Sequence, residues 1–446
     1  MKRSSLIGHL VELLDLFRGD RQPADRILKA YYRRRGYLGS KDRRYISECF
    51  FGLLRNLALV EYYAGRSLEP SPRGATRTRP PSIALLTAYL VRVGHDDAAA
   101  LRPDVAGMWN KTVREVELDT FFSALLTIAP PGDHEGVPAG RLAIEYSLPE
   151  FIVTEWVAEF GGPGAEELCR SLSEPAPTSI RVNTLRCSVG ECRERLAREG
   201  IGVGPARISP GALCLTKRTN VSALQSFREG WFEMQDEGSQ IIGMLVLPAP
   251  GSRIVDACAG GGGKTLHLAA LMRNTGTIVS IDVDEKRLGA IQPRLARAGV
   301  TIVELMHAVR DEARIAAMNN SADAVLVDAP CSGVGTFRRN PGAKMLVTPE
   351  GVEHLVSTQS TLLDRYANLV KPGGRLVYST CTLLRAENQD QIEAFLGRHA
   401  EFTIQQAGAL LRQQGIAIEG EGPFLVLLPQ RYGTDGFFAA VLEKRV

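Results

Sequence analysis

The stretch that decides the fold is RIVDACAGGGGKTLHLAAL, residues 253–271. Its opening residues are apolar and β-branched, which is typical of a buried strand, and its closing residues favour a helix. Four consecutive glycines lie between them. Because glycine has no Cβ, backbone N–H groups at the start of the helix can approach a polar ligand closely. The stretch therefore predicts a strand–loop–helix unit that binds a nucleotide-like ligand.

The pattern continues downstream as alternating strands and helices. Strands are predicted at TIVSIDVD (277–284), ADAVLVDAP (322–330) and GGRLVYST (373–380), with a helix at KRLGAIQPRLARAG (286–299) between the first two. Strands that alternate with helices form a parallel sheet covered on both faces. We expect an α/β domain over residues 241–446 with a doubly wound, mostly parallel, Rossmann-like sheet.

The glycine loop fits three classes of ligand in part, and the sequence is compared with the motif of each. A P-loop requires glycine where this chain has Cys258. The strand that ends at Asp328 nevertheless fits the Walker B strand of P-loop NTPases. A dinucleotide fingerprint requires glycine where this chain has Thr265. S-adenosylmethionine remains, because Asp282 ends the next strand 20 residues after Gly262 (282 − 262), the spacing of a ribose-binding acid.

Two cysteines follow predicted parallel strands, Cys331 in DAPCSG and Cys381 in STCT. Ligands of open α/β sheets bind at that edge. A zinc site is disfavoured because neither cysteine has a neighbouring Cys or His, and His267 and His307 are not aligned with them. Thiolates are strong nucleophiles when a nearby cation lowers their pKa, and Lys264 is available for that purpose. We therefore expect no metal, and a nucleophilic role for the cysteines.

A methyl donor beside two thiols points to pyrimidine chemistry. The C5 carbon of a pyrimidine is too electron-poor to attack a sulfonium methyl group, but thiolate addition at C6 makes C5 enamine-like. The ring nitrogen N3 then needs a hydrogen-bonding acid, and Asp328, three residues before Cys331, could supply one if it retains its proton. A second thiol could help to expel the first.

The rest of the chain suggests two further domains. The chain has 446 residues and a net charge of +3, but residues 1–100 hold 18 basic and 10 acidic side chains. Helical spacing predicts helices from Ser5, Pro23 and Ser40, and the Pro- and Gly-rich segments 67–82 and 129–140 predict a loop and an interdomain linker. We expect a helical domain over 1–138 and a small α+β domain over 139–240.

Six basic residues stand out in the helical front part, and they are Arg33, Arg34, Arg35, Lys41, Arg43 and Arg44. They fit either an ordinary solvated helix face or a surface that contacts phosphates. The eight cysteines are too dispersed for a disulfide framework, and Glu12 and Asp15 interrupt the only apolar stretch near the N-terminus. These features predict a cytoplasmic protein with reduced thiols and no contact with membranes.

Several segments resemble the RNA 5-methylcytosine methyltransferases of the RsmB/NOP/NSUN family. The catalytic motifs are DACAGGGGKT (256–265), DAPCSGVGTFRRNP (328–341), KPGGRLVYSTCTLLRAEN (371–388) and TDGFFAA (434–440). Upstream, residues 147–161, 179–186 and 230–240 resemble the family's RNA-binding lead-in, and residues 42–56 resemble a helix of the NusB-like domain of its bacterial rRNA members. The resemblance covers nearly the whole chain.

The resemblance implies a role for each motif residue. Cys381 attacks C6 of cytosine, and Cys331 assists release of the methylated base. Asp282 contacts the ribose of S-adenosyl-L-methionine, and Asp328 lies where cofactor and substrate meet. The residues that line the cofactor are Cys258, Ala259, Gly260, Gly261, Gly262, Gly263 and Lys264.

The chain departs from the family pattern at three places. Gly261 replaces a proline, and Ala308 stands where an acidic adenine contact is expected, with His307 and Asp311 as alternatives. The segment NPGAKMLVTPE (340–350) lacks the tryptophan that usually follows its lysine.

We predict an S-adenosylmethionine-dependent RNA cytosine-C5 methyltransferase that is monomeric and acts on rRNA. The alternatives are a tRNA substrate, a P-loop NTPase, and a non-catalytic RNA-binding protein with a degenerate cofactor fold.

Overall fold

The computed structural model describes residues 1–20, 22–69, 79–113, 116–132, 138–217, 219–419 and 422–446. The chain forms two compact units. The helical unit comprises residues 1–175 and 337–348, and the α/β unit comprises residues 176–336 and 349–446. The predicted division into three domains, at residues 138 and 240, stays a prediction.

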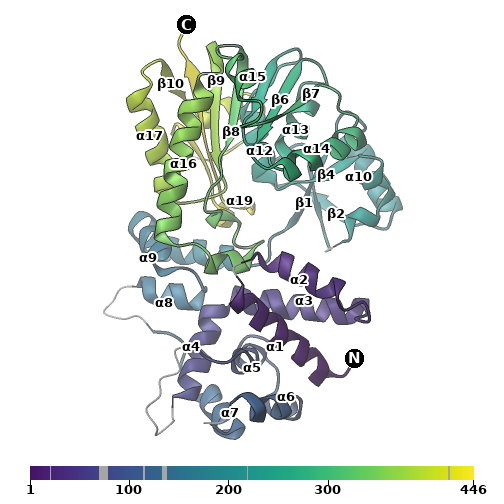
Figure 1. The fold of residues 1–446 in the computed structure, drawn as a ribbon, viewed down its shortest axis with the longest axis vertical. Helices are drawn as coiled ribbons and strands as arrows, with labels where there is room; N and C mark the ends of the chain where they lie inside the picture. The colour runs from purple at the N-terminus through teal and green to yellow at the C-terminus, as the bar shows by residue number, and fades with distance from the viewer. Residues whose placement is uncertain (21, 70–78, 114–115, 133–137, 218, 420–421) are drawn as a thin grey trace. The chain divides into compact units, whose positions relative to one another are not determined.

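The α/β unit is built on an eight-stranded sheet (Figure 1). The strand order is β10-β12-β9-β8-β5-β6-β7, with β11 paired to β12. Strands β5 to β9 are parallel, and β12 runs antiparallel to β9, β10 and β11. The strands are β5 (Arg253–Asp256), β6 (Thr277–Asp282), β7 (Val303–His307), β8 (Ala322–Asp328), β9 (Val370–Thr380), β10 (Phe402–Gln405), β11 (Phe424–Leu427) and β12 (Phe437–Lys444). The predicted doubly wound, Rossmann-like sheet is confirmed.

Helices cover both faces of this sheet. One apolar core contains side chains of α12 (Glu237–Leu245), α13 (Gly263–Leu271), α14 (Glu285–Ala298) and α18 (Ala407–Arg412). The other contains side chains of α15 (Glu312–Ala316), α16 (Pro349–Ala367) and α17 (Gln389–Arg398), while the short helix α19 (Pro429–Tyr432) precedes β12. Burial on both faces explains why β5 and β8 are continuous apolar runs rather than alternating ones.

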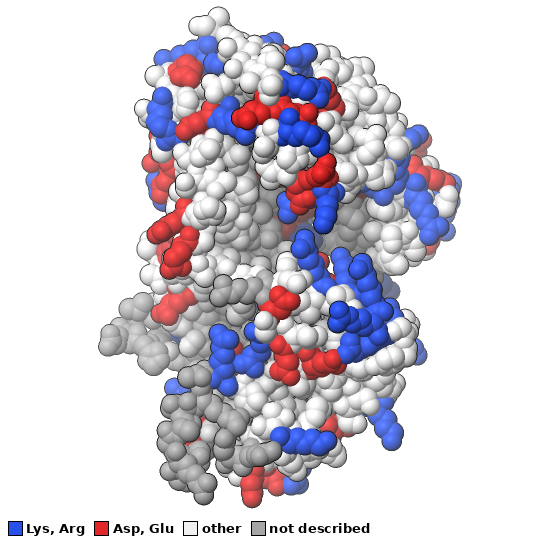
Figure 2. Space-filling model, viewed as in Figure 1, with Lys and Arg blue, Asp and Glu red and all other residues white. Residues whose placement is uncertain are grey.

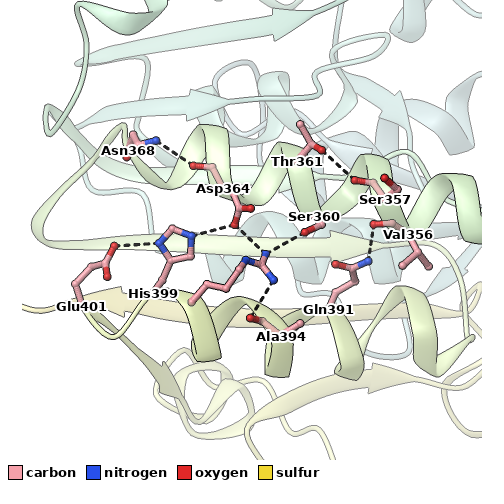
Figure 3. A network of polar contacts seen from close by, with 11 residues as sticks. Val356, Ser357, Ser360, Thr361, Asp364, Asn368, Gln391, Ala394, His399 and Glu401 are labelled. Carbon is pink, nitrogen blue, oxygen red and sulfur yellow. Dashed lines mark hydrogen bonds and ion pairs between the residues drawn. The ribbon is translucent and has the colours of Figure 1, made fainter.

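A polar network joins α16 to α17 on the outside of the unit (Figure 3). The Asp364 carboxylate accepts hydrogen bonds from Arg398 Nη2 and from the His399 ring, both at 2.9 Å. Arg398 also donates to Ser360 Oγ at 3.0 Å, and Gln391 donates to the Val356 carbonyl at 2.7 Å. These contacts fix the two helices against each other beside the core, so that α16 can hold its inner face over β8 and β9.

A four-stranded antiparallel sheet with the order β2-β3-β1-β4 precedes the large one. Its strands are β1 (Thr178–Val182), β2 (Val203–Pro205), β3 (Ala212–Leu215) and β4 (Phe232–Met234), and its helices are α10 (Val189–Arg198) and α11 (Gln225–Arg228). Ser188 and Glu191 form a capping box that begins α10. Strand β1 includes the first residues of segment 179–186, which resembles the family's RNA-binding lead-in.

The helical unit contains nine α-helices among the described residues. They are α1 (Arg3–Gly19), α2 (Ala24–Arg33), α3 (Ser40–Arg55), α4 (Leu57–Leu68), α5 (Ser82–Arg92), α6 (Ala98–Thr112), α7 (Leu118–Thr127), α8 (Pro138–Glu145) and α9 (Glu150–Ser173). The predicted helices from Ser5, Pro23 and Ser40 are confirmed. Pro138 begins a helix rather than ending a linker, because proline fits the first helical position. Residues 70–78 and 133–137 of the two predicted loop segments lie outside the described ranges. Figure 2 shows Lys and Arg side chains gathered over α2 and α3.

The segment 337–348 leaves the α/β unit and belongs to the helical unit. Its Lys344 is 1% exposed, and Nζ donates to the Tyr146 carbonyl at 3.0 Å, to Ser173 Oγ at 3.3 Å and to the Arg55 carbonyl at 3.4 Å. These acceptors lie at or just beyond the C-terminal ends of α8, α9 and α3. Helix C-termini carry partial negative charge and attract cations. Burial lowers the pKa of Lys344 to about 7.

Candidate active site

A cavity of about 490 Å³ opens at the carboxyl ends of β5, β6, β8 and β9. The chain leaves β5 toward β6 on one side, and β8 lies on the other side of β5, which makes this the point where ligands of open α/β sheets bind. Its lining includes all but one of the residues predicted from the sequence, namely Cys258, Ala259, Gly260, Gly261, Gly263, Lys264, Asp282, Asp328, Cys331 and Cys381. Gly262 lies behind them as the N-cap of α13, with a φ of 79° that favours glycine.

The glycine loop is fixed by the carboxylate that ends β6. Asp282 accepts a hydrogen bond from Gly260 N at 2.7 Å through Oδ2 and from Asp284 N at 2.8 Å through Oδ1. A carboxylate has about four acceptor positions, so both oxygens can still accept from another donor. Asp282 is thus placed both to shape the loop and to bind hydroxyl groups in the cavity.

The carboxylate that ends β5 is completely buried. Asp256 Oδ2 accepts from Thr265 Oγ1 at 2.7 Å, whereas Oδ1 has no hydrogen-bond partner among the described residues. Burial raises the pKa of Asp256 to about 6, an increase that the Thr265 hydrogen bond limits. An unpartnered buried oxygen in a cavity wall is a polar position that a bound ligand can satisfy.

Lys264 and Asp328 form an ion pair inside the cavity. Lys264 Nζ lies 2.6 Å from Asp328 Oδ2, and Ser379 Oγ donates to Asp328 Oδ1 at 2.8 Å. Burial alone would lower the pKa of Lys264, but the neighbouring Asp328 carboxylate more than offsets this and raises the pKa. Lys264 therefore stays charged beside Asp328. The role of Asp328 as a hydrogen-bonding acid stays a prediction.

The two predicted cysteines meet across the cavity wall. Cys331 Sγ lies 3.3 Å from Cys381 Sγ, and Cys381 N donates to Cys331 Sγ at 3.4 Å. The hydrogen bond to Cys381 and burial raise the pKa of the Cys331 thiol well above its ordinary value. Cys331 therefore keeps its proton and can donate it to Cys381. All eight cysteines are free thiols.

Glu387 holds the loop that carries Cys331. Its side chain is buried and accepts from Ser332 N at 2.8 Å, from Ser332 Oγ, and from Gln359 Nε2 at 2.9 Å. Gln359 also donates to the Pro330 carbonyl at 2.9 Å. Sequence reasoning assigned no role to Glu387, although it lies within the motif that contains Cys381.

Two arginines hold the outer side of the glycine loop, and sequence reasoning missed both. Arg181 on β1 donates to the Gly263 carbonyl at 2.8 Å and to Gln235, which lines the cavity. Arg294 on α14 donates to the Gly261 carbonyl and, at 2.9 Å, to Glu233 on β4.

Arg297, one turn after Arg294, pairs with the other oxygen of Glu233, and within the described residues its side chain forms no hydrogen bond with the glycine loop. Arg181 and Glu233 thus connect the small sheet to the glycine loop, and no local sequence motif predicts these contacts.

The cavity wall near Ala308 is apolar. Ala308 lines the cavity together with Val283, Leu362 and Tyr366. Neither of the two predicted substitutes for an acidic contact belongs to this lining. Asp311 Oδ2 accepts from His307 N at 2.8 Å, and His307 Nδ1 accepts from Val309 N at 3.3 Å. The adenine contact therefore stays unassigned. Val283, Ala308 and Leu362 form an apolar slot in this part of the lining.

These features fit S-adenosylmethionine. The cavity volume lies within the range of small-molecule sites, roughly 300–1,000 Å³. Asp282 and the free oxygen of Asp256 offer acceptors, the glycine loop offers amides, and the apolar slot suits a purine ring. In the described part of the chain, no group of three or more His, Cys, Asp or Glu side chains is arranged to hold a metal ion. None of the helices described there is long and apolar enough to cross a membrane.

Comparison with known proteins agrees with this architecture. Residues 243–443 match the family model of the 16S rRNA methyltransferases RsmB/F, and residues 148–222 match the ferredoxin-like domain of RsmF/B-like proteins. A probable ribosomal RNA small subunit methyltransferase B from Bacillus subtilis (strain 168) is 31% identical, with 100% of both chains covered.

Two solved structures share the fold. The crystal structure of PH0851 superposes with a TM-score of 0.77 at 26% identity and covers 100% of this chain and 99% of its own. A methyltransferase homolog protein from Pyrococcus horikoshii gives a TM-score of 0.58 at 28% identity over 68% of this chain and 97% of its own. The cavity, the paired cysteines and these matches lead to one assignment. The chain belongs to the RsmB/F family of 16S rRNA methyltransferases.

Proposed function

We propose that this chain methylates C5 of a cytosine in ribosomal RNA, with S-adenosyl-L-methionine as the methyl donor and Cys381 as the nucleophile. The observation that carries the proposal is the contact of the two thiols at the edge of the cavity that the glycine loop and the Lys264–Asp328 pair also line. A P-loop NTPase has no use for two apposed cysteines, and family membership excludes that hypothesis. The same cysteines argue against a non-catalytic RNA-binding protein.

Activation of the base begins at Cys381. Its thiolate adds to C6 of the cytosine, which forms a C–S bond and moves the ring electrons toward C5 and N3. The Cys331 thiol stabilises the Cys381 thiolate before attack by donating a hydrogen bond to it. Bound S-adenosylmethionine supplies an electrophilic methyl group for C5.

The Lys264–Asp328 pair stabilises the negative charge that develops on the cytosine ring. Lys264 Nζ carries the proton, Asp328 holds the ammonium group in place, and Ser379 in turn donates a hydrogen bond to Asp328. Such a preorganised donor stabilises developing negative charge without reorganisation during the reaction. We assign Lys264 as the proton donor to the ring and Asp328 as the residue that orients it and accepts from the exocyclic amine.

Release of the product reverses the addition. The proton on C5 and the C6–S bond are lost together, and the electron pair of the broken C–H bond restores the C5=C6 double bond. Cys331 can pass its thiol proton to the departing Cys381 sulfur and take up the proton lost from C5. The N3 proton returns to Lys264, and both cysteines end as thiols. The one proton that the methyl group displaces leaves to solvent when Cys381 forms its thiolate for the next turn.

Basic surfaces support an RNA substrate. Arg33, Arg34 and Arg44 are exposed over α2 and α3, where the charge gathers in Figure 2. Counterion release makes such surfaces effective for binding phosphates. We propose that residues 1–138 and 139–240 both contribute to RNA binding, that rRNA is preferred to tRNA, and that the protein acts as a cytoplasmic monomer. A target cytosine must be unpaired or flipped, at a cost of a few kcal/mol.

The test uses 16S rRNA transcribed in vitro, labelled S-adenosylmethionine and two variants. Cys381→Ala should abolish methylation, whereas Cys331→Ala should accumulate a protein–RNA adduct that survives denaturing electrophoresis. Cys214→Ala, at a cysteine that is not part of the cavity lining, serves as the control and should keep full activity. Full turnover by the Cys381 variant would refute the assignment.

A further inference from the structure

A second cavity in the α/β unit carries an unusual concentration of positive charge. Its volume is about 370 Å³, and it lies between the β2–β3 loop of the small sheet, the C-terminal side of α18, and α19. Arg207, Arg412 and Arg431 line it, and Glu419 is the one carboxylate among the described residues of the lining. In this part of the chain, three guanidinium groups therefore face one carboxylate.

These arginines differ from most others in the unit. Arg195, Arg294, Arg314 and Arg398 all form ion pairs with nearby carboxylates. The side chains of the three cavity arginines, in contrast, are exposed and have no ion pair or hydrogen bond to any residue that the structure describes. Unpaired guanidinium groups around a concave surface are well suited to bind oxygen atoms of phosphate.

The cavity is built on rigid backbone. Glu237 Oε2 accepts hydrogen bonds from the backbone N–H groups of Arg207 and Ile208, both at 2.9 Å, which fixes the β2–β3 loop. The Tyr432 hydroxyl donates to the Glu419 carbonyl at 3.0 Å.

The Arg207 guanidinium lies directly against Gly433. A Cβ on this glycine would come within 2.1 Å of Arg207 Nη1, and its φ of +70° also favours glycine. Gly433 therefore leaves room for the arginine.

The position of the cavity relates it to the active site. Phe438 on β12 pairs with Thr380 on β9, so the residues just before β12 lie at the same edge of the sheet as Cys381. Helix α19 lies at this end of the sheet (Figure 1). Gly436, three residues after Gly433, donates from its N–H to the Gly335 carbonyl at 2.8 Å, and Gly335 N donates to the Cys381 carbonyl at 3.0 Å. Backbone contacts thus lead from the arginine cavity to the nucleophile.

We propose that Arg207, Arg412 and Arg431 form a binding site for backbone phosphates of the RNA substrate, outside the cofactor and base pocket. The inference rests on the proposed function for the identity of the RNA. The chemistry favours phosphodiester groups because three exposed guanidinium groups around one concave surface match anionic oxygens and offer no recognition of base edges. The site positions the strand that carries the target cytosine and does not select its sequence.

The test compares two double variants of the full chain that lose the same charge. Arg412→Gln/Arg431→Gln removes two arginines of the cavity. Arg253→Gln/Arg273→Gln removes two exposed arginines near the amino ends of β5 and β6, at the opposite edge of the sheet. Binding of fluorescent 16S rRNA fragments is measured by anisotropy from about 50 to 200 mM salt, a range over which phosphate contacts weaken strongly.

Each phosphate contact contributes about 0.7 to 0.9 to the slope of log K against log salt. The slope of the cavity variant should therefore be smaller in magnitude than that of wild type by about 1.5. At about 0.1 M salt, the variant should bind RNA roughly 10- to 50-fold more weakly. Its kcat at saturating RNA and its affinity for S-adenosylmethionine should stay at the wild-type level. The control should match wild type in slope and in Kd within about twofold.

An unchanged slope in the cavity variant, or an equal loss in the control, would overturn the proposal. Titration calorimetry with inorganic phosphate gives a second test. If phosphate binds wild type but not the cavity variant, while both proteins bind RNA equally well, the cavity is a site for small anions and the proposal is overturned. Methylation of RNA by the wild-type protein is measured in parallel. If wild type binds and methylates RNA, the proposed function holds, and the outcomes above concern the arginine cavity alone.

Discussion

Arg294 offers a direct test of how the glycine loop is held for its ligand. Arg294 and Arg297 both pair with Glu233, but only Arg294 also donates to the Gly261 carbonyl. Arg294→Gln therefore removes a loop contact and an ion pair, and Arg297→Gln removes an ion pair alone. Because the amides of this loop line the cavity, a loosened loop must be ordered again when S-adenosylmethionine binds.

The expected magnitude follows from the exposure of the side chain. A hydrogen bond from a charged donor contributes about 1.5 to 3 kcal/mol. The Arg294 side chain is 27% exposed, so solvent screens part of the interaction, and we take about 1 kcal/mol for the contact with Gly261. That value corresponds to an increase of about fivefold in the Kd for S-adenosylmethionine.

The assay is isothermal titration calorimetry with S-adenosylmethionine in the absence of RNA, accompanied by thermal unfolding of each variant. Arg294→Gln should weaken binding about fivefold. Arg297→Gln should leave Kd near the wild-type value, and both variants should lower Tm by a similar small amount. Equal Kd values for the two variants would show that the loop contact does not set cofactor affinity, and the reasoning would be refuted.

Three further predictions concern buried charges. Lys264→Met should lower kcat by at least about 100-fold, the usual effect of losing a proton donor, while calorimetry should show a Kd for the cofactor within a few-fold of wild type. Glu387→Gln should lower the free energy of unfolding by roughly 1.5 to 3 kcal/mol, as measured by denaturant titration, because Ser332 loses its charged acceptor; an unchanged midpoint would count against this role. The pKa of Asp256 is raised from 3.8 to about 6, so the folded protein holds this proton up to a higher pH than the unfolded chain does. The contribution of Asp256 to the free energy of unfolding is therefore fully present below about pH 4 and is lost as the pH rises through 6. Asp256→Asn should therefore flatten the stability profile between these values and stabilise the apoprotein at pH 7 by about 2 to 3 kcal/mol, and an unaltered profile would show that Asp256 does not titrate there.

Local patterns were sufficient to predict the fold class, the strands β5, β6, β8 and β9, and most residues that line the cavity. The glycine run, the acid at the end of β6 and the thiols after β8 and β9 follow from strand ends, because parallel strands bring their carboxyl ends to one edge. The ion pair between Lys264 and Asp328 could not be predicted, because the two residues are 64 positions apart in the sequence and meet only when α13 packs beside β8. Arg181 and Arg294 were missed for a similar reason. Their partners are backbone carbonyls far away in the sequence, and no motif marks a carbonyl acceptor.

Segment 337–348 shows a second limit of sequence reasoning. It lies between two parts of the α/β unit in the sequence, and its basic, Pro- and Gly-containing composition is typical of a surface loop. Only the three-dimensional arrangement places Lys344 among the ends of three helices. A buried lysine cannot be distinguished from an exposed one by residue type alone.

That segment also limits how the chain can be divided. A chain shortened to residues 176–446 would keep the large sheet but would retain the twelve residues 337–348 (348 − 336) without the helices that surround them. Lys344 would lose the Tyr146 and Arg55 carbonyls and Ser173, and the loop that carries Cys331 would be followed by an untethered stretch. The two units are thus interleaved along the polypeptide, and a cut after residue 175 leaves part of the helical unit attached to the α/β unit.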